Sequence, residues 1–463
     1  MCCAAASVAL VGLHPDSYQQ DGGHHFLFAR YAWGHPTFFV GVWNRPLFTF
    51  LYAFPALLGY PAAKLFTVVI ALVTAWQTYR LAEDLKLERA WFAIALVFLE
   101  PSYFLLSAET MTEPLFALLF VSGVRLHLAG RVSAGMLVAS LLPLARPEGF
   151  FLVPLWAVWV VTDGRDVRAW WQRVPGLTRL AAGIAIWWIA ALAITGDPLF
   201  ILHTWPSGWT AGDRTYGTGP IWIYIARLPE MAGPLLAFVL LVGLAASLRA
   251  RRLTLLTSAF LTLFVLHSII RVAGSFGSAG YARYFVSVSP AIAIITLAGW
   301  NHIAARMARV SARVRTLAAT AIVALSAIVC VLYADMAGFY GRDARAVNDM
   351  RDWLRDHPQP VTRLIWSQAY MCIALDRDPL ENVSFSGHRD ADLDTLRRVG
   401  PGTLVFWDED TGPAWHGLTA ADIESAGFVR LHSQTYVLDG WLRESRWLFG
   451  WPPRVQQMHL LYK

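Results

Sequence analysis

The feature that most constrains this chain is a succession of apolar runs, separated by short charged loops, from the N-terminus to Leu332. A helix needs about 20 apolar residues to cross a bilayer, and several of the runs approach that length. Hydrophobic residues make up 56% of the chain and charged residues only 15%, whereas soluble domains carry roughly 25% charged residues. The sequence therefore predicts a polytopic α-helical membrane protein with about 10–11 spans.

The first run is short. Cys2 to Leu13 falls below the span of about 20 residues, so we expect the first helix to be incomplete or its start to lie upstream. Because no basic segment comes before it, we do not expect it to be a cleavable signal peptide. We expect paired short or tilted helices around residues 132–161. The later runs lie at residues 60–80, 90–107, 113–129, 132–145, 150–161, 177–195, 231–248, 253–270, 285–303 and 316–332.

The Lys and Arg residues are distributed unevenly between alternate loops. If the N-terminus is cytoplasmic, every strongly basic loop falls on the cytoplasmic side, as topology rules require. The opposite loops are rich in acids, His and aromatic residues. The sequence thus predicts a multi-pass protein of the cell membrane whose C-terminal part is extracytoplasmic. The basic loops lie at residues 80–89, 125–131, 165–179, 249–252 and 306–315.

The character of the sequence changes after the last apolar run. We predict a membrane domain over residues 1–340 and a small soluble α/β domain over residues 341–463, because strand-like and helix-like segments alternate there. Strands are expected at residues 363–366, 403–407, 428–435 and 457–462, and helices at residues 344–357, 392–399 and 420–426. This C-terminal part contains no Gly-rich phosphate loop and no nucleophile elbow.

The charged residues argue against a nucleic-acid-binding protein, and the cysteines argue against a metal site or a disulfide framework. The net charge of +6 arises from Lys and Arg in the short loops, so we do not expect nucleic acid as a partner. The four cysteines have neither metal-ligand spacing nor the pattern of a disulfide framework. Cys330 lies within an apolar run and is interpreted as a small core residue.

The loop after the first apolar run carries an unusual set of ionisable residues, among them Asp16, Asp21, His24 and Arg45. A carboxylate near the end of a span lies where the dielectric constant falls, and its pKa can rise towards the range of a general base. Asp16 is the candidate base. Alternatively, Asp16 caps the following helix.

Further ionisable residues occupy the other loops on the same side. Such residues at membrane depth are costly and are functional candidates by default. Arginines beside carboxylates suit the binding of a lipid phosphate together with removal of a proton from an attacking hydroxyl. The alternative is internal salt bridging between helix ends. The candidates are Glu109, Glu113, Arg146, Glu148, Arg271, Arg283 and Tyr284.

Several short motifs together resemble those of a known enzyme superfamily. His14-Pro15-Asp16, followed by Gln19, resembles the HPDE-and-Q motif of mannosyltransferases that use dolichyl phosphate mannose. Asn44-Arg45-Pro46 is similar to the segment that closes the same loop in that family. Ser107 with Thr112-Glu113, Arg146-Pro147-Glu148-Gly149 and Ala282-Arg283-Tyr284 resemble later segments of GT-C glycosyltransferases. The resemblance covers residues 1–305, in order and on the expected side. The acidic pair of the first motif is here Asp16-Ser17, so one carboxylate is absent unless Asp21 replaces it.

The resemblance implies a GT-C-like fold and an inverting transfer of a sugar, with mannose as one candidate, from a polyprenyl-phosphate donor. Asp16 would be the catalytic base. The substrate-binding residues implied are Gln19, Asp21, His24, Arg45, Glu109, Glu113, Arg146, Glu148, Arg283 and Tyr284. No cofactor is required, although Asp16, Glu109 and Glu113 could hold a divalent cation. The expected partners are the donor, membrane lipids and a glycan, lipid or protein acceptor.

Two other functions remain open. A transporter or flippase for a lipid-linked or anionic substrate would use the charged residues as a gate, but such proteins usually have internal repeats and ionisable residues near the midplane. An O-antigen ligase or polymerase would also use lipid-linked sugars, but its large outer loop comes late in the chain. The position of the acids favours the transferase.

Overall fold

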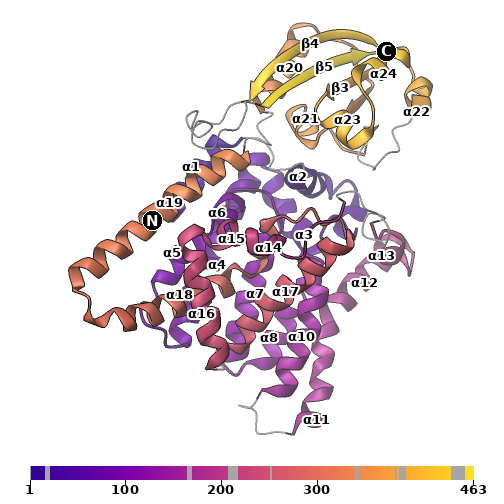
Figure 1. Cartoon of the computed structure of the whole chain (residues 1–463). Helices are drawn as coiled ribbons and strands as arrows, with labels where there is room; N and C mark the ends of the chain where they lie inside the picture. Colours follow the sequence, from indigo (N-terminus) through magenta and orange to yellow (C-terminus); the bar gives the residue numbers. More distant parts are fainter. Residues whose placement is uncertain are drawn as a thin grey trace.

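A computed structural model shows a bundle of helices with a small sheet domain at one end (Figure 1). Among the described residues, every element before residue 339 is a helix, and all strands lie after it. The residues described are 2–15, 21–163, 169–206, 217–250, 253–338, 344–380, 383–384, 393–438 and 454–463. The predicted fold class is therefore confirmed. The boundary predicted between residues 340 and 341 lies outside the described residues.

The apolar runs of the sequence form helices of two lengths. Within the described residues, five helical stretches are long and apolar enough to cross a membrane, namely Tyr60–Asp84, Trp171–Thr195, Thr254–Ala273, Ala282–Arg309 and Ala312–Asp335. Shorter apolar helices are Cys2–Leu13, Pro46–Ala56, Val132–Ala145, Gly149–Thr162 and Pro234–Arg249. The run expected at residues 90–107 is divided into α5 (Phe92–Phe98) and α6 (Pro101–Leu106), because Pro101 lacks an amide hydrogen and occupies the first turn of α6.

Two glycines let the central helices of the bundle approach closely. Helix α16 (Pro234–Arg249) crosses α18 (Ser289–Arg306) where Gly243 faces Gly299. A Cβ atom on Gly243 would lie 2.0 Å from the Ile295 carbonyl oxygen, and one on Gly299 would lie 2.2 Å from that of Val239. Helices in lipid associate by this kind of close backbone packing, since apolar side chains gain little by leaving lipid.

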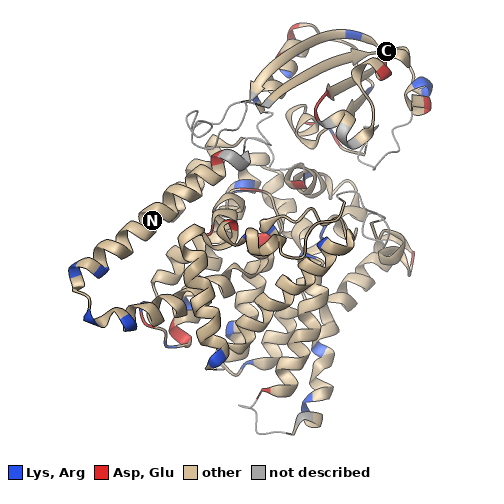
Figure 2. Cartoon of the chain, viewed as in Figure 1, with Lys and Arg blue, Asp and Glu red and all other residues tan. Residues whose placement is uncertain are grey.

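Contacts between loops define one end of the bundle. At the ends of α4 (Tyr60–Asp84) and α7 (Glu113–Leu128), Arg125 Nε lies 2.9 Å from Asp84 Oδ2. Arg89 Nη1 donates to Asn301 Oδ1 of α18 over 3.1 Å. We call this the basic end, and Lys and Arg gather on its loops (Figure 2). The described contacts thus place the loops at residues 80–89 and 125–131 at one end, while the compartment that each end faces stays a prediction.

The opposite end, which we call the domain end, is built from short helices. They are α2 (Asp21–Tyr31), the 3₁₀ helix η1 (Pro36–Phe39) and α3 (Pro46–Ala56), all between α1 (Cys2–Leu13) and α4. Trp187 Nε1 of α12 (Ala182–Thr195) donates to the Val40 carbonyl oxygen over 2.8 Å and ties this segment to the bundle.

The sheet domain has five strands in the order β2-β1-β3-β5-β4. Strands β2, β1 and β3 are parallel, and β5 runs antiparallel to both β3 and β4. All six residues of β3 are buried, as expected for a strand in the middle of a sheet. The strands are β1 (Arg363–Trp366), β2 (Val383–Ser384), β3 (Thr403–Asp408), β4 (Val429–Leu438) and β5 (Arg454–Tyr462). The helices are α20 (Ala344–Asp356), α21 (Ala369–Ala374), α22 (Leu393–Arg398), α23 (Thr411–His416) and α24 (Ala420–Ser425). The four predicted strands are confirmed, and β2, α21 and α23 were not predicted.

The sheet domain rests on α2. His35 Nε2 lies 2.7 Å from Asp378 Oδ2, and the Tyr31 hydroxyl donates to Asp376 Oδ1 over 3.3 Å. The ring of His24 lies 5.7 Å from that of Trp366, at the end of β1. Helix α2 therefore touches the sheet domain along one side and begins, at Asp21, among the buried charges of the bundle.

Candidate active site

The centre of the domain end is the segment Ser107–Thr112, between α6 and α7. It is a loop in sequence, yet its polar side chains are almost fully buried, with Glu109 1% exposed and Glu113, the first residue of α7, 0% exposed. Buried charges require partners, because removing an ion from water without one is very unfavourable. Each of these carboxylates has an arginine or lysine beside it.

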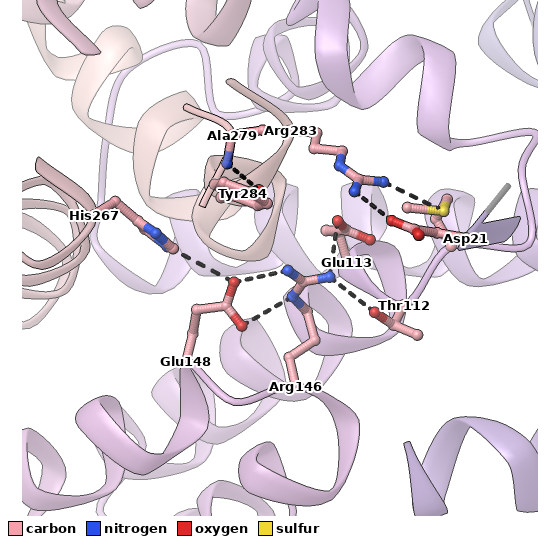
Figure 3. A network of polar contacts seen from close by, with 10 residues as sticks. Asp21, Thr112, Glu113, Arg146, Glu148, His267, Ala279, Arg283 and Tyr284 are labelled. Atoms are coloured by element: carbon pink, nitrogen blue, oxygen red, sulfur yellow. Dashed lines mark hydrogen bonds and ion pairs between the residues drawn. The ribbon is translucent and has the colours of Figure 1, made fainter. Parts of the chain in front are cut away.

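Arg146 joins two carboxylates. Its Nη1 atom lies 2.8 Å from Glu113 Oε1, and its Nη2 and Nε atoms lie 2.7 and 3.1 Å from the two oxygens of Glu148. Nη1 also donates to Thr112 Oγ1 over 2.9 Å. Figure 3 shows the guanidinium between the two carboxylates. The bidentate contact fixes the plane of the guanidinium as well as its position.

A glycine makes this turn possible. Arg146 ends α9 (Leu142–Ala145) in an extended conformation, and α10 (Gly149–Thr162) begins three residues later. A Cβ atom on Gly149 would lie 2.3 Å from the backbone of Leu142 and Pro143. Only glycine fits here, so Gly149 allows the chain to reverse and present Arg146 and Glu148 together.

His267 extends this network and was not found from the sequence. It lies in α17 (Thr254–Ala273), with Nε2 3.7 Å from Glu148 Oε1 and its ring stacked on Tyr284 at 4.9 Å between centroids. An ionisable residue within an apolar run is a functional candidate, so His267 could have been found from the sequence on that ground. Burial alone would raise the pKa of Glu148, but Arg146 opposes this and holds the pKa at about 2.

A second ion pair lies beside the first. Arg283 Nη2 contacts Asp21 Oδ2 at 2.5 Å, and its guanidinium lies over the rings of Tyr281 and Tyr284. In Figure 3 this pair adjoins Glu113. Asp21 is 29% exposed at the side chain, whereas Arg283 is 9% exposed. The accessible member of the pair is therefore the carboxylate.

Arg45 is a third buried arginine at this end. It adopts a left-handed conformation with φ of 59°, immediately before Pro46 and α3. Such a conformation is unfavourable for a residue with a Cβ atom and is concentrated at functional sites. Its Nη1 donates to the Val42 carbonyl oxygen over 3.1 Å. Burial, followed by the charge of Arg146, lowers the pKa of Arg45 to about 9. Arg45 and Arg146 are thus held in one buried region, together with the carboxylates of Glu113 and Glu148.

The remaining predicted residues are placed differently. Glu109 pairs with Lys64 rather than with an arginine, at 3.1 Å. His24 faces Trp366 of the sheet domain, while its neighbour His25 is buried near Arg45. Burial, and then the charge of Arg45, lowers the pKa of His25 well below 6.5. Asp16 and Gln19 lie outside the described residues.

No metal site is visible in the part of the chain that the structure describes, since no group of three or more His, Cys, Asp or Glu side chains has suitable geometry. Of the candidate ligands, Glu109 is engaged by Lys64 and Glu113 by Arg146. Their arrangement fits charge pairing better than coordination of a cation.

The sequence matches no known protein family and no curated protein. Solved structures of similar fold include ArnT from Cupriavidus metallidurans bound to undecaprenyl phosphate, with a TM-score of 0.63 and 14% identity, covering 99% of this chain and 97% of that one. The same protein in the apo state gives a TM-score of 0.61 and 15% identity, covering 98% and 96%. At these identities the likeness establishes the fold. This chain accordingly has an ArnT-like fold over nearly its whole length.

Proposed function

We propose that this protein is a membrane glycosyltransferase that moves a sugar from a polyprenyl-phosphate donor to an acceptor. One observation carries the proposal: Arg45, Arg146 and Arg283 converge with carboxylates at the domain end of a fold shared with ArnT, which has been crystallised with undecaprenyl phosphate. Buried arginines suit a phosphate, because the phosphate accepts charge-assisted hydrogen bonds from the guanidinium.

The proposed reaction is an inverting displacement. The acceptor hydroxyl oxygen attacks the anomeric carbon, the bond from that carbon to the phosphate oxygen breaks, and the hydroxyl proton passes to a carboxylate. The lipid phosphate leaves with the bonding electrons. The arginines stabilise the charge that develops on this leaving group, which is the usual largest contribution in such sites.

Asp16 is the proposed base, from its place directly after α1 and from the motif around it. Asp21 is the second candidate, because its carboxylate is 29% exposed and can meet an acceptor. Glu148 is unsuited to this role, since a carboxyl with a pKa of about 2 is a poor proton acceptor near neutral pH. We assign Glu148 and Glu113 to holding Arg146. Mannose is the first sugar to test, and the sheet domain, docked on α2, is the proposed acceptor side.

The proposal is tested by incubating the purified full-length protein with a panel of polyprenyl-phosphate sugars, mannose included, and a lipid and glycan extract as acceptor. We expect acceptor-dependent release of polyprenyl phosphate with one donor, and loss of release in Arg146→Met. If none of the donors releases polyprenyl phosphate, the proposal of a transferase is wrong. Protein-dependent movement of a labelled donor across a vesicle wall, without release, would instead establish the transporter.

A further inference from the structure

A buried ion pair outside the arginine cluster is not used by the proposed mechanism. Lys64, in the second turn of α4, is 1% exposed, and its partner Glu109 is also 1% exposed. Lys64 Nζ lies 3.1 Å from Glu109 Oε1 and 5.1 Å from the centroid of the Tyr60 ring. It also donates to the carbonyl oxygen of His14, the residue that follows α1.

The segment that carries Glu109 contacts α1, α2 and Arg146. Ser107 Oγ lies 2.8 Å from Ser7 Oγ of α1, and Thr110 Oγ1 donates to the Gly22 carbonyl oxygen over 2.7 Å. Gly22 follows Asp21 directly. Two residues after Thr110, Thr112 accepts a hydrogen bond from Arg146 over 2.9 Å. One short segment thus bears on both the Asp21–Arg283 and the Arg146–Glu113 pairs.

The ion pair is a costly way to hold this segment. Taking two charges out of water costs several kcal/mol for each, and apolar residues of similar volume often stabilise a fold as well or better. Because the contacts of a buried ion pair are directional, such a pair serves better to fix the position of a segment than to stabilise the fold. Lys64 makes contact with α1 through His14, with Tyr60 and with the Ser107–Thr112 segment at once.

We propose that Lys64 and Glu109 are positioning residues, which hold the Ser107–Thr112 segment so that the Asp21–Arg283 and Arg146–Glu113 pairs stand at the spacing that transfer requires. This inference rests on the proposed transferase function. It assigns Glu109 to orientation rather than to substrate or metal. Its action on the reaction passes through Thr110, Thr112 and the carbonyl of His14.

The test compares the double variant Lys64→Met/Glu109→Leu with Arg125→Met/Asp84→Leu, which removes an ion pair at the basic end. Because the first double variant leaves no buried charge unpaired, we expect it to fold with a Tm close to that of the wild type. We expect its kcat per folded molecule to fall at least 10-fold, with KM for the donor changed less than 3-fold. The control should keep its kcat. Lys64→Arg, which retains a charge and donors, should recover part of the lost kcat.

Two results would overturn the inference while leaving the transferase intact. One is a wild-type kcat in the folded Lys64→Met/Glu109→Leu variant. The other is a loss that merely follows the folded fraction, with no recovery in Lys64→Arg. An inactive wild type, by contrast, counts against the transferase itself.

Discussion

The two ends of the helix bundle use charge in opposite ways. At the basic end the pairs that arginine forms are open to water, with Arg125 and Asp84 22% and 37% exposed and Arg89 and Glu88 46% and 78% exposed. At the domain end, Arg146 and its carboxylates are all below 10%. Exposed pairs contribute little to stability, whereas buried ones are expensive and need a reason. The comparison therefore separates exposed pairs, which can vary at little cost, from buried pairs, which are the ones that the proposed transferase would use.

The largest difference between the two ends is expected when Asp16→Asn at the domain end is compared with a matched variant at the basic end. The substitution removes a proton acceptor but keeps the size of the side chain, so transfer should fall about 100- to 10,000-fold. Membrane insertion and Tm should be unchanged. The measure is release of polyprenyl phosphate, with Asp84→Asn at the basic end as the matched control. Retained activity in Asp16→Asn would transfer the role of base to Asp21.

The second-largest effect is expected from Arg146→Met, which should lower both the activity and the stability of the fold. It leaves Glu113 and Glu148 buried without their cation, which costs about 3–5 kcal/mol when a buried pair loses one partner. We expect a marked drop in Tm and undetectable transfer. Arg125→Met provides the comparison. Equal drops in Tm for the two variants would show that the two ends do not differ in the way proposed here.

His267→Phe should have a moderate effect. The phenyl ring can still stack on Tyr284, but the contact with Glu148 is lost. At 3.7 Å this contact is too long for a hydrogen bond, so its loss is a weaker electrostatic change. We expect kcat to fall by no more than about 5-fold, with little change in Tm. Steady-state kinetics at saturating donor measure this. An unchanged kcat would show that His267 contributes to packing and not to the reaction.

The smallest effect is one of pH on stability. The pKa of His25 is lowered in the folded protein, so the unfolded chain binds a proton below pH 6.5 that the folded chain does not. Acidification from pH 7 to 5 should therefore favour unfolding, by at most about 1.4 kcal/mol per pH unit. The wild type and His25→Asn should have similar profiles above pH 7 and diverge below pH 6. Thermal melts across this range measure the difference, and parallel profiles would contradict it.

Much of the fold follows from the apolar runs, because length and hydropathy decide what can cross a lipid bilayer. The grouping of loops at two ends was predicted from the uneven distribution of Lys and Arg between alternate loops. The division of residues 90–107 into two helices was signalled only by Pro101. The short strand β2 was missed, since two residues carry no periodicity.

The sequence could predict several residues of the candidate site, but it could not predict how they pair. Glu113, Arg146 and Glu148 were expected to lie near one another, and they do. Which cation pairs with which acid depends on tertiary packing, so the Lys64–Glu109 pair could not be foreseen. Lys64 and His267 were overlooked because each stands alone within a long apolar run.

The missing side chain at Gly149 has a consequence for recognising related chains. Because no Cβ atom fits between Leu142 and Pro143 at this turn, a chain with alanine there cannot keep the same backbone path. Such a chain would have to present its arginine and glutamate by another turn. A sequence pattern that treats glycine and alanine as equivalent after Arg-Pro-Glu would therefore group chains whose backbones differ at this turn.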